Sequence, residues 1–510
     1  MATDNCPKKT ISSDITGLSY AIEDCLRTLP DNPVWKPLEP NSIDTFGATI
    51  TTATRTPIGS GRQRIKGEVI DLEAAAGYTT DLTSTNHQDF IEGFLLARAR
   101  QQALMSNDPT PSITALEADG MTFSVPTVFA EGDIIMIQGS TVEGANGVRT
   151  VATVEADKLS LTFVLPSGVT AFPEDSAFGT NVNGKVVTVG HKMAQGDVKV
   201  QYNAATKHYS LASTAGFPAG ITANVQAGDW VYVSGLKGYE GYARVTAADA
   251  AGLLTFDRIL GKADTVVSDA QSTCELYLSM SIRNPDKFED MVFHSFQFEQ
   301  TLGADADGTQ ARYVLGAMAN EFTLTVPAAD KVTAQLSFVA CDEDARTGAD
   351  GLKAGTRPPL VTHPMFNASK TSNRVWLHTA GEAEPLFAYA TNATVTINNN
   401  MTGVKAIGVE GNMDINVGTF EVGGSITAYF LDMRAVKAIR SNADVGGTVA
   451  LVGNQVGVVF DMPKMGLSNG QTTIEVNQPV TIALDMAAVR NDLGYTMQYA
   501  YFAYLPKTTK

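Results

Sequence analysis

The chain has 510 residues, which at roughly 150 residues per domain predicts three or four domains. Its 37 Lys and Arg against 54 Asp and Glu give a formal net charge of −17, and 44% of its residues are apolar. This apolar share excludes a mainly disordered chain, and the acidic balance without a basic block argues against a protein that wraps nucleic acid. The charge has two open interpretations, solubility alone or a functional role. The 45 glycines and the abundant Thr and Val favour β structure with many turns.

Signals of several other protein classes are absent. No run of about 18 apolar residues predicts a membrane span, and residues 1–9 lack the apolar stretch of a signal peptide. The cysteines Cys6, Cys25, Cys274 and Cys341 are widely spaced. This spacing predicts reduced thiols in a protein made in a cytoplasm, not a disulfide framework.

The first stretch, residues 1–108, is expected to begin with a helix and continue with strands. Residues 18–26 have helix-like spacing of apolar side chains. Residues 48–54 and 65–72 alternate in the manner of strands, and a loop rich in Gly and Arg separates them.

A second helix is predicted over residues 85–105. Thr85 or Asn86 is a suitable cap, and Phe90 and Phe94 belong to an apolar face.

The second stretch, residues 109–270, opens with a linker signal and contains an internal repeat. Residues 131–139 match residues 227–235, each with a Gly-Asp pair before an apolar strand, and Gly228 lies 96 residues after Gly132. A Gly-Asp pair suits a tight turn. The repeat therefore predicts two small β-barrel-like modules, at about 120–166 and 220–260.

The third stretch, residues 271–510, is again β-rich and ends in an order seen at the start of the chain. Asp432 is expected to cap a short helix through Ile439, directly after a predicted strand, as the strand at 78–82 precedes the helix at 85–105. The other predicted strands are at 322–326, 332–338, 393–398 and 424–430. We interpret the first and third stretches as a duplicated β-rich domain, interrupted by an insertion at 109–270.

Motifs for catalysis or metal binding mostly fail. Residues 466–470 match the GxSxG nucleophile pattern around Ser468, but a polar turn is favoured because no strand and helix are expected on its two sides. The acidic runs at 305–308 and 342–344 lack the full ligand set of a calcium loop. The six histidines are far apart, and no phosphate-binding GxxxxGK[ST] motif occurs. We expect no enzyme, no metal and no cofactor.

Several short motifs follow one another in a characteristic order outside the insertion. They are Leu-Ser-Tyr-Ala-Ile-Glu-Asp at 18–24, Trp-Lys-Pro-Leu at 35–38, the Arg-containing loop at 58–64, the strand region at 288–298, Tyr-Val-Leu-Gly-Ala-Met-Ala-Asn-Glu-Phe-Thr-Leu at 313–324, Ala-Thr-Val-Thr-Ile-Asn-Asn-Asn-Met at 393–401, Gly-Ser-Ile-Thr-Ala-Tyr-Phe-Leu-Asp at 424–432 and Asp-Met-Pro at 461–463.

In this order, residues 17–105 and 271–506 resemble the major tail tube protein of long-tailed (siphovirus-type) bacteriophages, in a two-domain form with an insertion. The resemblance implies a mainly β fold: a duplicated tail-tube β-sandwich or barrel domain, each copy flanked by a short helix, with the two small β modules added. The first domain would be residues 1–108, the insertion 109–270, and the remainder of the first domain with the second domain 271–510.

The resemblance also implies a structural virion protein that polymerises as stacked rings into the tail tube, the conduit for DNA ejection. If each chain supplies two domains of four wall strands, three chains form a pseudo-hexameric ring of 24 strands, although hexamers are possible. The implied partners are other copies of the chain, the tape-measure protein and the tail terminator and distal tail proteins. Genomic DNA would pass through the lumen without specific binding, and no membrane is involved. The protein would reside in the virion tail after assembly in the host cytoplasm.

The loop at residues 54–66 is the candidate contact between stacked rings. Its cations Arg55, Arg62, Arg64 and Lys66 would lie near acidic side chains of the neighbouring ring.

Two other classes of function stay open. One is an adhesin or decoration protein whose β modules bind host glycan or receptor through exposed aromatics, for which Trp230, Tyr232 and Tyr239 are the candidates. The alternative for these three residues is a place in the core, where such aromatics more often lie. The other is an enzyme with a site scattered in sequence, for which Ser468 would be the first residue to test.

Overall fold

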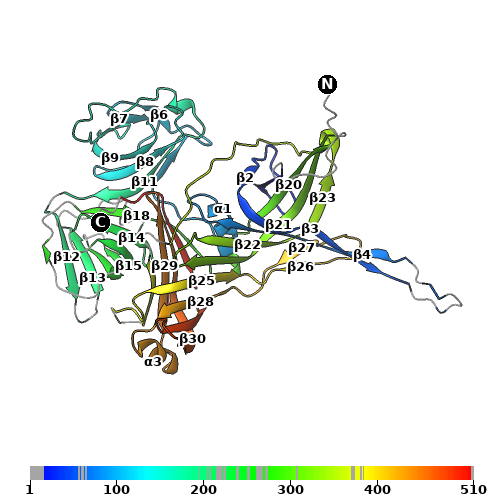
Figure 1. Ribbon diagram of the computed structural model, residues 1–510. Helices are drawn as coiled ribbons and strands as arrows, with labels where there is room; N and C mark the ends of the chain where they lie inside the picture. Colours follow the sequence, from blue (N-terminus) through cyan, green and yellow to red (C-terminus); the bar gives the residue numbers. More distant parts are fainter. Residues whose placement is uncertain are drawn as a thin grey trace, which may run out of the picture.

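The computed structural model describes residues 16–506 with short gaps, and strands dominate it (Figure 1). The gaps are residues 56–57, 59–61, 64–65, 195, 204, 206–207, 214–216, 218–220, 222–224, 237–239, 250–252, 260–267, 270–273, 306–307, 369–373, 380–381 and 383. The described helices are α1 (Gln88–Leu95) and α3 (Arg434–Arg440), with 3-10 turns η2 (Phe178–Thr180), η3 (Phe288–Asp290) and η4 (Gly348–Asp350).

The larger sheet has 16 strands drawn from the two ends of the chain. Its strands are β1 (Gly17–Ile22), β2 (Lys36–Leu38), β3 (Pro40–Ala53), β4 (Glu68–Asp81), β19 (Met280–Arg283), β20 (Ser295–Asp305), β21 (Gly308–Pro327), β22 (Thr333–Ala340), β23 (Asp342–Arg346), β24 (Arg374–Thr379), β25 (Ala390–Asn398), β28 (Glu421–Tyr429), β29 (Val445–Gly453), β30 (Val456–Thr473), β31 (Thr481–Ala488) and β32 (Gln498–Phe502). A separate hairpin consists of β26 (Thr402–Val404) and β27 (Asp414–Asn416).

The second sheet has 14 strands, all from residues 104–278, and lies to one side of the larger sheet (Figure 1). Its strands are β5 (Leu104–Ser106), β6 (Ile113–Leu116), β7 (Gly120–Phe123), β8 (Asp133–Gln138), β9 (Gly147–Val154), β10 (Ser160–Phe163), β11 (Lys185–Lys192), β12 (Val198–Asn203), β13 (His208–Ser213), β14 (Trp230–Ser234), β15 (Gly241–Asp249), β16 (Leu253–Ile259), β17 (Ser268–Asp269) and β18 (Glu275–Leu278).

The larger sheet contains the same strand arrangement twice. The paired order β1–β20–β21–β22–β4–β3 recurs as β24–β29–β30–β31–β28–β25, with every pair antiparallel. An extra strand pairs with each long strand, β23 with β21 and β32 with β30. The chain order also matches, because α1 follows β4 and α3 follows β28. We call these units copy one (β1, β3, β4, α1, β20–β23) and copy two (β24, β25, β28, α3, β29–β32).

Alternation along the strands explains the main core. In β22, Ala334, Leu336 and Phe338 are buried, whereas Gln335 between them is exposed. Period-two patterns place every second side chain on one face of a sheet, and burial of that face stabilises it by about 25 cal/mol per Å² of apolar surface. The strands predicted at 322–326, 332–338, 393–398 and 424–430 all lie in this sheet.

The repeated Gly-Asp pairs of the second sheet form the same turn twice. Gly132 and Gly228 have φ of +84° and +91°, a region that favours glycine. The carboxylate of Asp133 accepts a 2.7 Å hydrogen bond from the amide of Ala130, and Asp229 does the same for the amide of Gln226. The two modules have separate apolar cores, one around β8–β10 and one around β14–β16.

The helix expected at residues 18–26 is wrong. Residues 17–22 form β1, which pairs with β2 on one side and β20 on the other. The aromatic ring of Tyr20 packs against Phe90 and Phe296, so tertiary pairing outweighs the local spacing that suggested a helix.

The helix expected at 85–105 is much shorter, and its cap is different. Only α1 is helical: Leu96 adopts φ +49° and ends it, and β5 begins at Leu104. The N-cap residue is His87, without a side-chain cap. Asn86 instead accepts a 3.0 Å hydrogen bond from the amide of Thr83. The N-cap residue of α3 is Met433, also without a side-chain cap, so the predicted cap is displaced by one residue. Asp432 accepts a 2.8 Å hydrogen bond from the amide of Arg434.

Residues 466–470 are not the isolated polar turn expected from the sequence. They lie within β30 and pair with β31 as far as Asn469, where a bulge interrupts the register. Asn469 and Gly470 have positive φ, as bulge residues often do.

Candidate assembly surfaces

Eight antiparallel strands of the larger sheet form one continuous run, which we call the wall sheet. Its order is β3–β4–β22–β21–β25–β28–β31–β30, where β21 contributes residues 321–327 and β30 contributes residues 466–473. The first four strands belong to copy one and the last four to copy two. Each copy therefore supplies four strands to this run.

The two copies are joined by the pairing of β21 with β25. Phe322 lies opposite Ile397 and both side chains are fully buried, while the hydroxyls of Thr323 and Thr396 lie 3.4 Å apart on the other face. Corresponding rows of paired, inward-facing residues cross each copy: Phe322–Leu336–Tyr78–Ile43 in copy one and Leu467–Met486–Gly424–Val395 in copy two.

The wall sheet ends in two open edges. Among the described residues, β3 pairs only with β4, and residues 466–473 of β30 pair only with β31. The rows above make Leu467 the equivalent of Phe322. Phe46 is the equivalent of Ile397. Phe46 pairs with Ala76, two residues before the row position Tyr78, and Ile397 pairs with Val422, two residues before the row position Gly424. Phe46 and Leu467 are only partly buried, unlike their equivalents at the joint. Open edges of this length invite pairing with another chain.

One face of the wall sheet is polar and carries no cation. None of its eight segments contains Lys or Arg. The side chains between the buried positions are hydroxyls, amides and acids: Thr45, Thr79, Gln335, Ser337, Thr323, Thr325, Thr394, Thr396, Ser425, Thr427, Asp485 and Ser468. Cross-strand hydrogen bonds order this face, as between the Thr79 hydroxyl and Asp44 at 2.9 Å. The absence of Lys and Arg from alternating strands is a signal that sequence reading could have used and missed.

Both ends of the wall sheet expose apolar side chains. β3 and β25 run in the same direction, so the β3–β4 and β25–β28 connections lie at the same end. Each connection carries a fully exposed isoleucine, Ile58 and Ile407. The opposite end exposes Tyr389, Leu431 and Val476, the last at 89% of its surface. Exposed apolar residues gathered on a polar protein mark interaction surfaces.

The predicted contact residues lie in the β3–β4 connection. Arg55, Arg62 and Lys66 are exposed there, beyond the end of the wall sheet. Arg64 lies outside the described residues. The structure thus brings three of the four cations into one connection, and their proposed partners belong to another chain.

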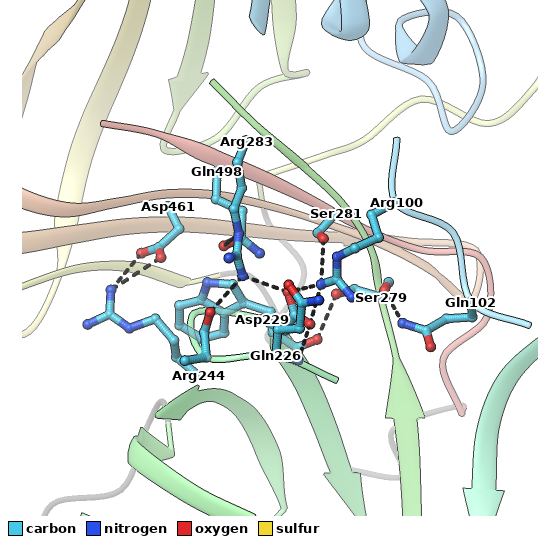
Figure 2. A network of polar contacts seen from close by, with 12 residues as sticks. Arg100, Gln102, Gln226, Asp229, Arg244, Ser279, Ser281, Arg283, Asp461 and Gln498 are labelled. Atoms are coloured by element: carbon cyan, nitrogen blue, oxygen red, sulfur yellow. Dashed lines mark hydrogen bonds and ion pairs between the residues drawn. The ribbon is translucent and has the colours of Figure 1, made fainter. Parts of the chain in front are cut away.

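A polar network fastens the second inserted module to the larger sheet. Figure 2 shows Arg100 and Arg283 meeting at Asp229, which lies in the repeated Gly-Asp turn. The Arg283 guanidinium lies 2.7 Å from Asp229 and also donates to Gln498 of β32 at 3.0 Å. The carboxylate of Asp229 is almost fully buried, at 3% exposure. Charges buried in this way require partners, so the turn is held in a fixed position.

A second buried ion pair joins the same module to copy two. Arg244 of β15 lies 2.5 Å from Asp257 of β16 and 3.2 Å from Asp461 of β30, whose side chain has no exposed surface. The hydroxyl of Thr448 donates a 3.1 Å hydrogen bond to Asp461. Burial lowers the pKa of the Arg244 guanidinium, but the nearby charges of Asp257 and Asp461 outweigh it and raise the pKa, so Arg244 stays charged.

Comparison with known families decides what kind of protein this is. The sequence profile of the family described as phage tail tube protein matches residues 13–488, nearly the whole chain. The chain belongs to the phage tail tube family. The resemblance inferred from the sequence is thereby confirmed, and so is the mainly β fold. No curated protein is significantly similar to it.

Membership of the tail tube family makes the chain a structural component of the phage tail, and this changes the reading of its aromatics. Trp230 and Tyr232 were candidate glycan contacts, but both are buried, at 1% and 8% exposure. They pack between the second module and Phe502 of β32 in a small core. Tyr239 lies outside the described residues. The aromatic argument for an adhesin was therefore wrong for the two residues that can be placed, because these side chains build the junction.

The residues of the candidate chemical motifs lie in strands or form ion pairs in the fold. Ser468 lies in the part of β30 that forms an edge strand, without the strand-turn-helix setting of a nucleophile elbow. Glu343 binds Arg312, and Asp344 binds Arg346. Within the described part of the chain, no group of three or more His, Cys, Asp or Glu is arranged to hold a metal ion. No described helix is long and apolar enough to cross a membrane.

Proposed function

We propose that the chain polymerises into stacked rings that form the phage tail tube, the conduit for DNA ejection. One observation carries this proposal. The equivalents of the paired strands β21 and β25 are β30 and β3, and these form the two open edges of the wall sheet. A head-to-tail contact closes into a ring when its rotation, repeated a whole number of times, completes one full turn.

The joint between neighbouring chains follows from the joint within the chain. β30 of one chain would pair with β3 of the next, as β21 pairs with β25. Leu467 would then lie opposite Phe46, as Phe322 lies opposite Ile397, and Ser468 opposite Thr45. This pairing would complete the burial of the partly buried Phe46 and Leu467 and satisfy both open edges.

The expected ring contains three chains, in pseudo-hexameric symmetry. Eight wall strands per chain then give a barrel of about 24 strands. With strands about 4.8 Å apart and tilted by about 45°, the circumference is about 160 Å and the backbone diameter about 50 Å. Side chains would reduce this to a lumen of roughly 40 Å, wider than duplex DNA.

The cation-free face is proposed to line the lumen. Attraction between Lys or Arg and phosphates supplies most of the non-specific affinity of proteins for DNA. A lumen of hydroxyls and carboxylates would let DNA pass without holding it. This assignment gives the net charge of −17 a functional role in addition to solubility.

Stacking of rings would use the two ends of the wall sheet. The cations Arg55, Arg62, Arg64 and Lys66 at one end would face exposed acids at the other, such as Asp330 and Glu475. In the virion, the tape-measure protein, the tail terminator and the distal tail proteins would contact the completed tube, after assembly in the host cytoplasm.

We further propose that the chain is organised as predicted, with two tube domains and an insertion at 109–270. The separation of strands supports this, since the larger sheet uses residues 17–81 and 280–502 and the smaller sheet residues 104–278.

Cysteine cross-linking tests the ring joint. In a Cys6→Ser, Cys25→Ser background, Ser468→Cys and Thr45→Cys would be combined, because directly opposed strand residues suit a disulfide. We expect tubes by negative-stain electron microscopy and, after oxidation, a ladder on non-reducing gels that ends at three chains. A ladder ending at six would indicate a hexamer.

The matched control pairs Ser468→Cys with Val182→Cys, an exposed residue of the insertion. It should give no ladder. If oxidised tubes of the Ser468–Thr45 variant show no cross-link between chains, the proposed joint is wrong. If the purified wild-type protein forms no tubes, the proposed function is wrong.

A further inference from the structure

We propose that the hairpin of β26 and β27, here called the arm, is a second contact between stacked rings. Its tip, Ile407, would enter a groove at the opposite end of β25 in an identical chain of the next ring. This inference rests on the proposed function and adds a contact that the cationic β3–β4 connection does not provide.

The arm occupies the place in copy two that the β3–β4 connection has in copy one. It links β25 to β28, the equivalents of β3 and β4, and lies beside that hairpin (Figure 1). The two connections carry the same kind of tip, since Ile58 and Ile407 are exposed to 108% and 107% of the reference surface. Duplication therefore gives the chain two tips at the same end of the wall sheet.

The base of the arm is held firmly, unlike a loose surface loop. The side-chain amide of Asn412 donates a 2.8 Å hydrogen bond to the carbonyl of Ala340, and its backbone amide donates to the carbonyl of Cys341 at 3.0 Å. Lys405 pairs with Asp71 of β4. Ile415 is buried in a small core at the base. The arm thus presents Ile407 from a fixed position, which lowers the entropy cost of docking.

A groove of about 590 Å³ lies at the other end of the same strands. Its lining includes Pro327 at the end of β21, Ala390 at the start of β25, Trp376 of β24 and Tyr389. Tyr389 is 74% exposed. The indole Nε1 of Trp376, a residue of this lining, is buried without a hydrogen-bond partner among the described residues.

The positions of arm and groove suit one occupant, a second copy of the chain. β25 begins at the groove and runs directly into the arm, so the two features lie at opposite ends of one strand. In rings stacked in the same orientation, the end of β25 in one ring faces its start in the next. The tip and the groove lie at opposite ends of β25, so their contact is heterologous. It repeats from ring to ring along the axis without closing, as a tube requires.

The test replaces the apolar tip with a charge. Ile407→Asp should leave the thermal melting temperature unchanged, because Ile407 is fully exposed. Added to the Ser468→Cys, Thr45→Cys variant, it should also leave the three-chain ladder unchanged. Tubes should be at least ten-fold shorter by electron microscopy, or absent. Val182→Asp, a change at another exposed apolar residue, in the insertion, should form tubes of wild-type length.

A second variant locates the partner of the tip. Ile407→Cys combined with Tyr389→Cys, in the same cysteine-depleted background, should cross-link chains in assembled tubes but not in separate rings. If the wild-type protein forms tubes and the Ile407→Asp variant forms tubes of the same length, the arm contact is wrong while the proposed function stands. Absence of tubes from the wild-type protein would instead overturn the proposed function, and the arm contact with it.

Discussion

The two copies of the repeated unit keep the same strands and differ in what connects them. In copy one, residues 96–294 lie between α1 and β20, whereas in copy two only residues 441–444 lie between α3 and β29. The β3–β4 connection of copy one carries Arg55 and Arg62, and the equivalent connection of copy two contains the arm. Every elaboration thus lies outside the wall sheet. If the wall sheet pairs with other copies of the chain, as proposed, it tolerates change only in its connections.

The inserted modules and the wall sheet are stabilised in different ways. The inserted modules have their own apolar cores and are fastened by buried charge pairs. The wall sheet has neither Lys nor Arg and leaves its edges open. The insertion therefore builds apolar cores of its own, while the wall sheet leaves two edges without a partner strand among the described residues.

The largest effect is expected from reversing charge in the copy-one connection. Arg62→Glu combined with Arg64→Glu should abolish stacking if these cations face acids of the next ring, because attraction would become repulsion. The monomer should still fold, since Arg62 is exposed. Sedimentation and negative-stain microscopy would measure the loss of tubes, and circular dichroism the fold.

A matched control places the same charge change elsewhere on the surface. Lys158→Glu combined with Lys185→Glu, at two exposed residues of the insertion, should leave tubes intact. Normal tubes from the Arg62→Glu, Arg64→Glu variant would show that the copy-one connection does not carry the contact.

A smaller but still large effect is expected at the anchor of the insertion. Arg244→Met would leave Asp257 and Asp461 buried without their cation, which typically costs about 3–5 kcal/mol. Urea unfolding of the purified protein would measure the loss. The control is Lys464→Met, which removes an exposed pair with Asp444 and should cost less than about 1 kcal/mol. Equal losses from the two variants would mean that the buried anchor does not stabilise the junction.

Local patterns predicted the elements whose periodicity matches their final environment. Alternation at 322–326 and 393–398 predicted strands β21 and β25, and the Gly-Asp repeat predicted equivalent turns at Asp133 and Asp229. The local pattern gave the wrong element at β1. The spacing of Leu18 and Ile22 there also fits a helix, and pairing with β20 makes the segment a strand.

The assembly surfaces depend on contacts that sequence spacing does not contain. The pairing of β21 with β25 could not be read from either strand, because alternation specifies which side chains face inward and not which strand lies beside them. The anchor between Arg244 and Asp461 joins residues 217 positions apart, and neither has a local signal. Duplication itself was visible as a repeated strand-helix order, but the open edges it creates were not.

The smallest effect is expected from adding one cation to the face that both copies share. Thr396→Lys would place a positive charge on the polar side of the joint between the copies, opposite Thr323. If this face lines the lumen, each ring of three chains gains three cations that converge on the passing DNA. Binding of a short DNA duplex to assembled tubes should rise about ten-fold at low salt and fall as salt increases, since each phosphate contact adds about 0.9 to the salt slope. Val182→Lys on the insertion should give a much weaker rise, because its charges do not converge. Equal binding by the two variants would place the cation-free face outside the lumen.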